Sequence, residues 1–311
     1  MPIPRTAVLL RTHLVNEKVF DLISILKKSN QYDLYISADE TNGPLNFCDI
    51  KKITNDRRLC PSLGLLDNPN VFWHCGDYAF YFAIDQIPDY EYYILVEYDV
   101  DFVRKNPLFL EGIISRLQCI DGSSFDFLSP HLHRAYPEWG WYDSVKSVFP
   151  EVWNTGIFGF VVASKKAIDF LYNLRKEEAK KELPQNLIAN CEAFCGSALM
   201  AAGKFKCGSF IDILEDSILW SSFHPPIENL ITSHYLLGNY EIKNPRVEVV
   251  HPVYDISEYM KREYSRALSR SELDAFIKNA INLQETHRDR NLILEYVERA
   301  IKHKINDTKG L

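Results

Sequence analysis

The sequence predicts an α/β fold in which helices flank a mostly parallel central sheet. Residues 6–10 and 33–37 have the character of buried strands, and a helical pattern separates them after Asn16. This strand–helix–strand order favours parallel pairing through a right-handed crossover. The run from Tyr92 to Val96 is apolar without polar alternation, which is typical of a central strand covered on both faces.

The first third of the chain alternates regular and irregular stretches. Val19, Ile23 and Leu26 recur at helical spacing, so a helix is expected between the first two strands. Residues 40–72 are rich in Gly, Pro, Asn and Asp and predict an irregular connection with one short helix. Asp77 is then placed to cap a helix that Pro88 would end.

Beyond the central strand the pattern continues in the same order. A helix is expected after Asn106-Pro107. Residues 157–163 predict a second apolar strand, beside which Gly156 and Gly159 permit close backbone approach. Ser164 is expected to cap the next helix, and a later helix is expected to open at Cys191 and to stop at Gly203.

The organisation predicted is a catalytic domain over residues 1–258 and a helical extension over residues 259–311. The extension carries 11 Lys and Arg against 8 Asp and Glu, whereas residues 1–258 carry 24 against 34. Two interpretations of this relatively basic tail stay open. It is a solvated helical layer, or it makes a weak contact with an anionic membrane or a partner.

Composition narrows the class of protein and its compartment. The chain of 311 residues has a net charge of −7, so it lacks the excess of positive charge that general nucleic-acid binding requires. Seven scattered Cys without zinc-like pairs favour free thiols in a reducing compartment. No segment approaches the length of a transmembrane span. We therefore expect a cytoplasmic protein. Its basic tail could in addition contact the inner face of a membrane.

The strongest chemical signal is Asp99-Val100-Asp101, directly after the central strand. Ligands of open α/β sheets bind beyond the carboxyl ends of the strands. Carboxylate oxygens are the ligands that Mg²⁺ and Mn²⁺ prefer, and such a metal would in turn hold a diphosphate. The alternative is an acidic pair that caps a turn or meets water.

Three further residues fall on the presumed ligand edge. Arg11 follows the first strand, Asp39 follows the second, and Asp77 precedes a helix. Each is a candidate contact for a nucleotide, while the plainer interpretation is a polar loop for Arg11 and Asp39 and a helix cap for Asp77. The chain has neither a dinucleotide-binding glycine motif nor a P-loop.

The segment from Pro130 to Trp153 is rich in His, Pro and Trp and has no regular period. Aromatic side chains on a polar loop suit stacking against sugars or bases. An acceptor-binding loop and simple packing both remain open for it.

Taken together, the strand–helix–strand opening, the Asp99 pair, Asn154-Thr155-Gly156, the Glu192 helix and the late His251-Pro252 resemble the GT-A glycosyltransferases. The resemblance covers approximately residues 5–255. It implies a GT-A, Rossmann-like fold. It also implies that Asp99 and Asp101 bind a divalent metal and the donor diphosphate, and that His251 completes the metal site. For His251 the alternative is a side chain that satisfies a backbone group at a strand end.

The resemblance also implies a catalytic base. Glu192 opens a helix where inverting members hold theirs, although Cys191-Glu192-Ala193 departs from the more usual Glu-Asp or Asp-Asp. A Glu that merely suits a helix N-terminus is the other interpretation. Asp212, Glu215 and Asp216 form a second acidic cluster near a strand end, and Asp216 is the competing candidate for the base.

The implied activity is Mn²⁺- or Mg²⁺-dependent transfer of a sugar, as by a hexosyltransferase, from a nucleotide-sugar donor to a glycan or glycolipid hydroxyl. The family's habit makes a UDP-sugar the expected donor. Two alternatives stay open. A nucleotidyltransferase also needs paired carboxylates and a metal, but its usual Gly-rich motif is missing near Arg11. A noncatalytic carbohydrate-binding or scaffold protein could retain the same fold.

Overall fold

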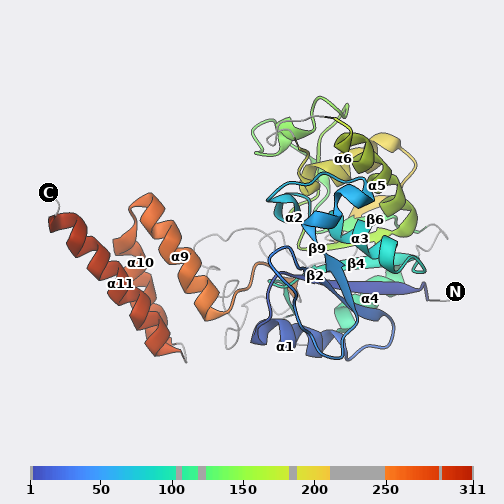
Figure 1. Ribbon diagram of the computed structural model, residues 1–311. Helices are drawn as coiled ribbons and strands as arrows, with labels where there is room; N and C mark the ends of the chain where they lie inside the picture. Colours follow the sequence, from blue (N-terminus) through green and yellow to red (C-terminus); the bar gives the residue numbers. More distant parts are fainter. Residues whose placement is uncertain are drawn as a thin grey trace. The chain divides into compact units, whose positions relative to one another are not determined.

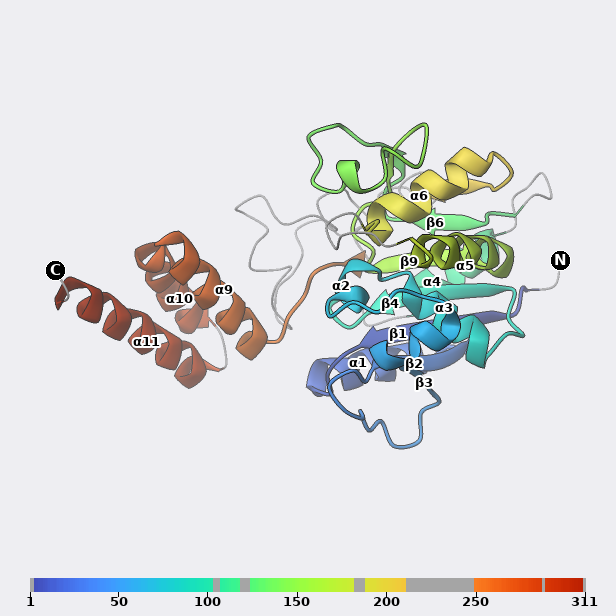
Figure 2. The ribbon, with the colours of Figure 1, turned by 45° about the horizontal axis from the view of Figure 1, so that its top comes forward.

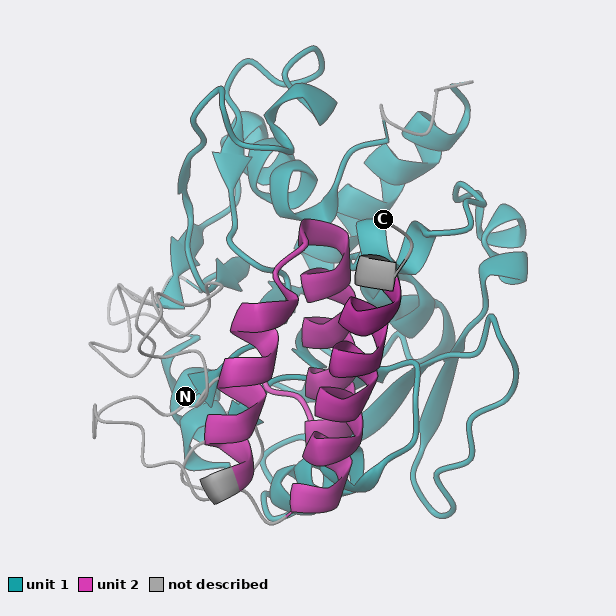
Figure 3. Ribbon diagram, turned by 90° about the vertical axis from the view of Figure 1, so that its left-hand side faces the viewer, with its two compact units in different colours: residues 1–226, 242–252 teal, residues 227–241, 253–311 magenta. Residues whose placement is uncertain are grey.

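The computed structural model describes residues 3–102, 107–117, 124–181, 188–210, 249–286 and 289–309. The chain divides into two compact units, coloured separately in Figure 3. Unit 1 comprises residues 1–226 and 242–252, and unit 2 comprises residues 227–241 and 253–311. The chain thus passes from unit 1 to unit 2 after Pro252.

Unit 1 is built on one large mixed sheet with helices on both faces (Figure 1). Its described strands follow the order β10-β6-β9-β4-β1-β2-β3. Neighbouring strands are parallel except that β9 runs antiparallel to both β4 and β6. The strands are β1 (Thr6–Thr12), β2 (Asp33–Asp39), β3 (Lys52–Asn55), β4 (Tyr92–Glu97), β6 (Phe127–Ser129), β9 (Phe160–Ser164) and β10 (Cys207–Ser209).

Helices cover the two faces unequally. Helices α1 and α4 lie on one face, and α3, α5 and α6 lie on the other (Figures 1 and 2). The predicted α/β class, with a mostly parallel sheet between helices, is confirmed. The helices of unit 1 are α1 (Glu17–Leu26), α2 (Val71–His74), α3 (Tyr78–Gln86), α4 (Leu108–Arg116), α5 (Lys165–Ala179) and α6 (Cys191–Ala202), and 3-10 turns occur at Arg57–Leu59, Pro61–Leu63 and Tyr142–Ser144.

Strand β4 shows why its sequence lacks polar alternation. Ile94 and Val96 pack into the apolar core beneath α1 and α4. Tyr93 and Leu95, which point to the opposite face, belong to the core beneath α3, α5 and α6. Because successive side chains of a strand alternate between faces, two covered faces require an uninterrupted apolar run. The prediction of a buried central strand is confirmed.

Local capping follows the sequence at three positions, of which Ser164 and Gly203 were predicted. The Asn16 side chain accepts a hydrogen bond from the Val19 amide and begins α1. The Ser164 hydroxyl does the same for the Ala167 amide at the start of α5. Gly203, in the left-handed conformation, ends α6, as expected for a residue without a Cβ.

One strand of the large sheet was not predicted. Lys52–Asn55 form β3, parallel to β2 at the edge of the sheet, inside the segment expected to be irregular. The strand is short and only alternate residues are buried, so it carries no long apolar run. The expected short helix of that segment corresponds to α2 and the 3-10 turns.

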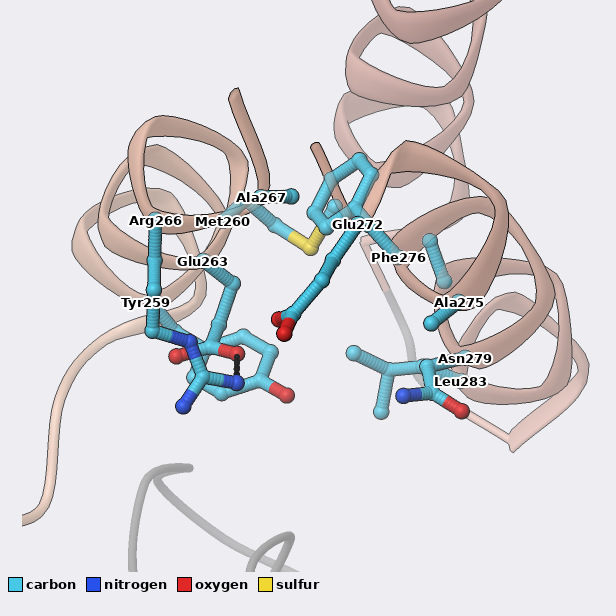
Figure 4. A pocket seen from close by; sticks show the side chains of 11 residues that line it. Tyr259, Met260, Glu263, Arg266, Ala267, Glu272, Ala275, Phe276, Asn279 and Leu283 are labelled. Atoms are coloured by element: carbon cyan, nitrogen blue, oxygen red, sulfur yellow. Dashed lines mark hydrogen bonds and ion pairs between the residues drawn. The ribbon is translucent and has the colours of Figure 1, made fainter. Parts of the chain in front are cut away.

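Unit 2 is helical in its described part. It contains α9 (Ile256–Arg270), α10 (Leu273–Thr286) and α11 (Arg290–Lys309), which share an apolar core around Met260 and Ile293. A small pocket lies between α9 and α10, where Arg266 pairs with Glu263 (Figure 4). No helix of the described residues combines the length and apolar character needed to cross a membrane.

Candidate active site

Strands β1 and β4 bring two charged side chains together at the carboxyl edge of the sheet. Arg11 and Glu97 are register partners on these parallel strands, and their side chains form an ion pair. A second Arg11 nitrogen donates to the Phe72 carbonyl at α2. Arg11, a predicted nucleotide contact, therefore links α2 to the end of the central strand.

A cluster of three possible metal ligands lies at this edge. Glu97, Asp99 and His251 each offer one ligand atom, and these atoms lie within 4.8 Å of one another. His251 Nε2 is 3.2 Å from Asp99 Oδ1. Carboxylate oxygens suit Mn²⁺ and Mg²⁺, but the imidazole nitrogen suits Mg²⁺ less, because that ion prefers oxygen. The donor set thus fits a divalent cation, with Mn²⁺ favoured.

Two distant segments of chain meet to build this cluster. Strand β5 (Asp101–Phe102) follows the Asp99 turn and pairs antiparallel with β11 (Val249–Val250). That pairing brings His251, the next residue after β11, to the turn. The fold thus unites residues that are about 150 positions apart in the sequence.

Gly159 leaves space for the imidazole ring of His251, because it has no Cβ. A Cβ at this position would lie 2.7 Å from His251 Cδ2 and 2.9 Å from Nε2. The Gly159 carbonyl also accepts a hydrogen bond of 2.8 Å from the Glu97 amide. The predicted close approach is confirmed here, and at Gly156, which has φ +71° and lies against His131.

Lys18 supports the turn that carries Asp99. It projects from α1 and is 2% exposed. Its ammonium donates to the carbonyls of Tyr98 and Val100, at 2.6 and 3.0 Å. Since a buried ammonium needs such partners, Lys18 fixes the backbone on both sides of Asp99.

The electrostatics of the cluster favour a cation. Burial raises the pKa of Glu97 above its usual value, and the charge of Arg11 opposes that effect. Burial disfavours the imidazolium of His251, but the carboxylates of Asp99 and Glu97 outweigh burial and raise its pKa. Acidic groups this close repel one another, so a bound divalent ion would relieve the repulsion.

Glu192 faces the same region from the start of α6. The Asn190 side chain accepts from the Glu192 amide at 2.8 Å and caps the helix. Thr155 donates to the Glu192 carbonyl at 3.0 Å through both its amide and its hydroxyl. The predicted helix start and the Asn154-Thr155-Gly156 turn therefore hold Glu192 in place together.

The Glu192 carboxylate has an unusual affinity for protons. Burial raises its pKa to about 7, partly offset by the charge of His251 and by a polar contact from the Trp141 side chain. Glu97 acts in the same direction as burial. Interaction with both Glu97 and His251 shows that Glu192 lies beside the cluster. A carboxyl with a pKa near neutrality is suited to act as a general base.

Two other predicted residues do not join the cluster, and a third lies outside the described residues. Asp39 ends β2 opposite Asn55 and accepts from the Thr41 amide at 3.1 Å. Asp101 lies on β5 opposite Val250 and is not one of the three clustered residues. Asp216 lies outside the described residues, as do Asp212 and Glu215.

Asp77 occupies the N-cap position of α3, but its side chain is engaged elsewhere. Its carboxylate makes no capping hydrogen bond to α3 and is completely buried. It accepts from Arg175 Nε at 2.8 Å, from Arg175 Nη2 at 3.0 Å and from the Tyr81 hydroxyl at 2.7 Å. Both oxygens are occupied, because the buried Arg175 needs a counter-ion. These contacts give Asp77 a structural role as the counter-ion of Arg175.

We expect Asp77→Ala to destabilise the protein by about 3–5 kcal/mol, because it leaves the Arg175 guanidinium buried without its counter-ion. Urea unfolding measures the loss. The matched control is Asp67→Ala, which breaks the partly exposed pair with Arg57 and should cost about 1 kcal/mol or less. Equal losses in the two variants would contradict the assignment.

Two residues of the site were missed from the sequence, although each left a signal. Glu97 was not proposed as a ligand. It is one residue from the apolar run and alternates with Asp99. Lys18 occupies the apolar face of α1 together with Leu22 and Ile25, all buried. A lysine at such a position predicts a buried ammonium with fixed partners.

Comparison with known proteins gives distant structural similarity. No protein-family model matches the chain, and no curated protein matches it. One similar solved structure is a glycosyltransferase involved in the glycosylation of the major capsid of PBCV-1, with 16% identity over 59% of this chain and 70% of that chain and a TM-score of 0.32. A second is glucosyl-3-phosphoglycerate synthase from Mycobacterium tuberculosis in complex with Mn²⁺, UDP-glucose and phosphoglyceric acid, with 12% identity, 60% and 68% coverage and a TM-score of 0.34.

A third similar structure is the catalytic domain of Drosophila β1,4-galactosyltransferase 7 in complex with xylobiose. It shares 14% identity over 62% of this chain and 71% of that chain, with a TM-score of 0.25. At these TM-scores the likeness is remote. The function proposed below therefore depends on the residues of the site.

Proposed function

We propose that this protein is a metal-dependent glycosyltransferase that uses a nucleotide-sugar donor. The observation that carries the proposal is the cluster of Glu97, Asp99 and His251 at the carboxyl edge of the sheet, beside Glu192 with a pKa of about 7. Ligands of open α/β sheets bind at this edge. In a metal-dependent inverting transfer, a cation assists the departure of the diphosphate and a carboxylate base accepts the proton of the acceptor hydroxyl.

Asp99 and His251 would hold the cation, with Glu97 as the third ligand. Asp101 remains a proposed ligand from the sequence, although it stands apart from the cluster. When bound, the cation offsets the charge that builds on the departing diphosphate. Arg11 lies at the same edge through its pair with Glu97, where its guanidinium is placed to contact a donor phosphate.

Glu192 would act on the acceptor. As the acceptor oxygen forms its bond to the anomeric carbon, the bond between that carbon and the diphosphate oxygen breaks. The hydroxyl proton passes to the Glu192 carboxylate, which must be deprotonated beforehand. Its partial burial keeps bulk water from competing for that proton.

The donor class follows from the sequence resemblance, which favours UDP-sugars, and Asp39 at the end of β2 is the candidate contact for the nucleoside. The acceptor is a hydroxyl of a glycan or glycolipid. These assignments are proposals about the chemistry of the site, and each is open to direct measurement.

The test is release of UDP from UDP-glucose, UDP-galactose, UDP-N-acetylglucosamine and UDP-xylose, each measured with Mn²⁺ and with chelator. We expect at least one donor to be hydrolysed slowly only in the presence of Mn²⁺, because water replaces the acceptor. Hydrolysis that chelator leaves unchanged would contradict metal dependence. Binding of saccharides without any donor turnover would favour the noncatalytic carbohydrate-binding alternative.

A further inference from the structure

We propose that Trp73 and Trp141 form the acceptor subsite and that it takes a pyranose ring. The inference rests on the proposed function and names the part of the site that function leaves open. Trp73 lies on α2. Trp141 lies in the loop between β7 (His133–Arg134) and β8 (Trp153–Asn154). The fold brings these two segments together.

The two indoles pack edge-to-face, and we call the pair the aromatic corner. One face of the pair, on Trp73, is open to solvent. Their ring centroids are 6.0 Å apart at an interplanar angle of 72°. His74 packs edge-on against Trp141 at 5.3 Å and is itself fixed by a 2.7 Å hydrogen bond to the Ile188 carbonyl. Trp141 is thus held from behind, whereas Trp73 is 72% exposed.

This corner lies beside the proposed base. The Trp141 side chain makes a polar contact that lowers the pKa of Glu192. On the other wall, Arg11 donates to the carbonyl of Phe72, the residue before Trp73. A sugar ring packed on the exposed indole of Trp73 would therefore have Trp141, and with it Glu192, on one side.

A glycine confirms how closely these parts approach. A Cβ on Gly76 would lie 2.9 Å from Arg11 Nη1 and 3.4 Å from Cys191 Sγ. The segment after α2, the end of β1 and the start of α6 therefore touch at one point. Trp73 is three residues before Gly76 in the chain.

The chemistry of the corner matches a sugar. A pyranose has apolar C–H faces and polar hydroxyl edges, and an indole offers a broad apolar face with a polar edge. A single exposed aromatic needs no explanation, but two adjoining indoles, one of them 72% exposed, do. The hydroxyl that reacts would point toward Glu192 while the ring packs on Trp73.

The test uses indole signals of the full-length protein labelled with ¹⁵N-tryptophan, in the presence of UDP and Mn²⁺. The probes are methyl β-glucoside, methyl β-galactoside, methyl β-xyloside, methyl α-mannoside, lactose and xylobiose. We expect at least one probe to shift the signals of Trp73 and Trp141 and to leave Trp153 in place. Trp73→Ala should weaken that binding about tenfold, as the loss of one aromatic contact predicts.

Phe20→Ala is the matched control, because Phe20 is also an exposed aromatic side chain, at 45%, but lies on α1, outside the aromatic loop of residues 130–153, so its loss should leave saccharide affinity unchanged. Two results would overturn the inference: no shift of either indole with any probe, or equal affinity in Trp73→Ala and wild type. Failure of UDP to bind with Mn²⁺ would refute the proposed transferase instead, and the indole shifts would still decide whether the corner binds saccharide.

Discussion

Asp99→Asn is expected to lower the affinity for UDP in the presence of Mn²⁺ by at least about 100-fold, since even residues that only support a metal ligand contribute about 10–100-fold. Asp99 is 6% exposed and lies 3.2 Å from His251 Nε2. Asparagine keeps its shape but removes the negative charge that the cation needs. Calorimetric titration of UDP with Mn²⁺ measures the change.

The same titration on Asp101→Asn distinguishes two ligand sets: the Asp99 and Asp101 pair predicted from the sequence, and the cluster seen in the structure. Asp101 stands apart from the cluster of Glu97, Asp99 and His251, so we expect a smaller loss in this variant. Melting temperatures of both variants control for misfolding. If the UDP affinity of Asp99→Asn stays within about twofold of wild type, the proposed metal site at this edge of the sheet is wrong.

Glu192→Gln should reduce transfer or donor hydrolysis by about 10²–10⁴-fold, the range that general-base catalysis contributes. The amide cannot accept the proton, but it preserves the size and the place of the side chain at the start of α6. UDP and Mn²⁺ should still bind, because the cluster is intact. Steady-state rates and calorimetry on the same preparation measure both properties. A rate close to that of wild type would mean that another group is the base.

The pH profile gives a second test of Glu192. With a pKa of about 7, the carboxyl is protonated and inactive as a base below that pH. The rate should therefore rise with pH and level off above about 7, falling about tenfold per unit on the acid side. A wild-type rate that stays constant from pH 5 to about 8 would contradict the assignment.

The fold was predictable where apolar patterns were long. The run Tyr92–Val96 and the helix capped by Asn16 both follow from local sequence. Strand β3 did not, because three of its four residues are polar and it is positioned by pairing with β2. The antiparallel direction of β9 likewise depends on a chain path that no local pattern specifies.

The site residue directly after the central strand was predictable. Residues that reach the site or their partners from distant parts of the sequence were less so. Asp99 followed from its position after a buried strand. His251 followed from the resemblance alone, and the β5–β11 pairing is what brings it to Asp99. The role of Asp77 was invisible because its partner Arg175 is 98 residues away. Buried ion pairs of this kind leave no periodic signal.

Electron paramagnetic resonance of Mn²⁺ tests the central claim most directly. Mn²⁺ is titrated into the protein with and without UDP, and the sharp signal of the free hydrated ion is followed. We expect that signal to disappear at a single saturable site, more completely with UDP, and to persist in Asp99→Asn. A free-ion signal that wild-type protein and UDP together leave unchanged would contradict a metal-dependent transferase.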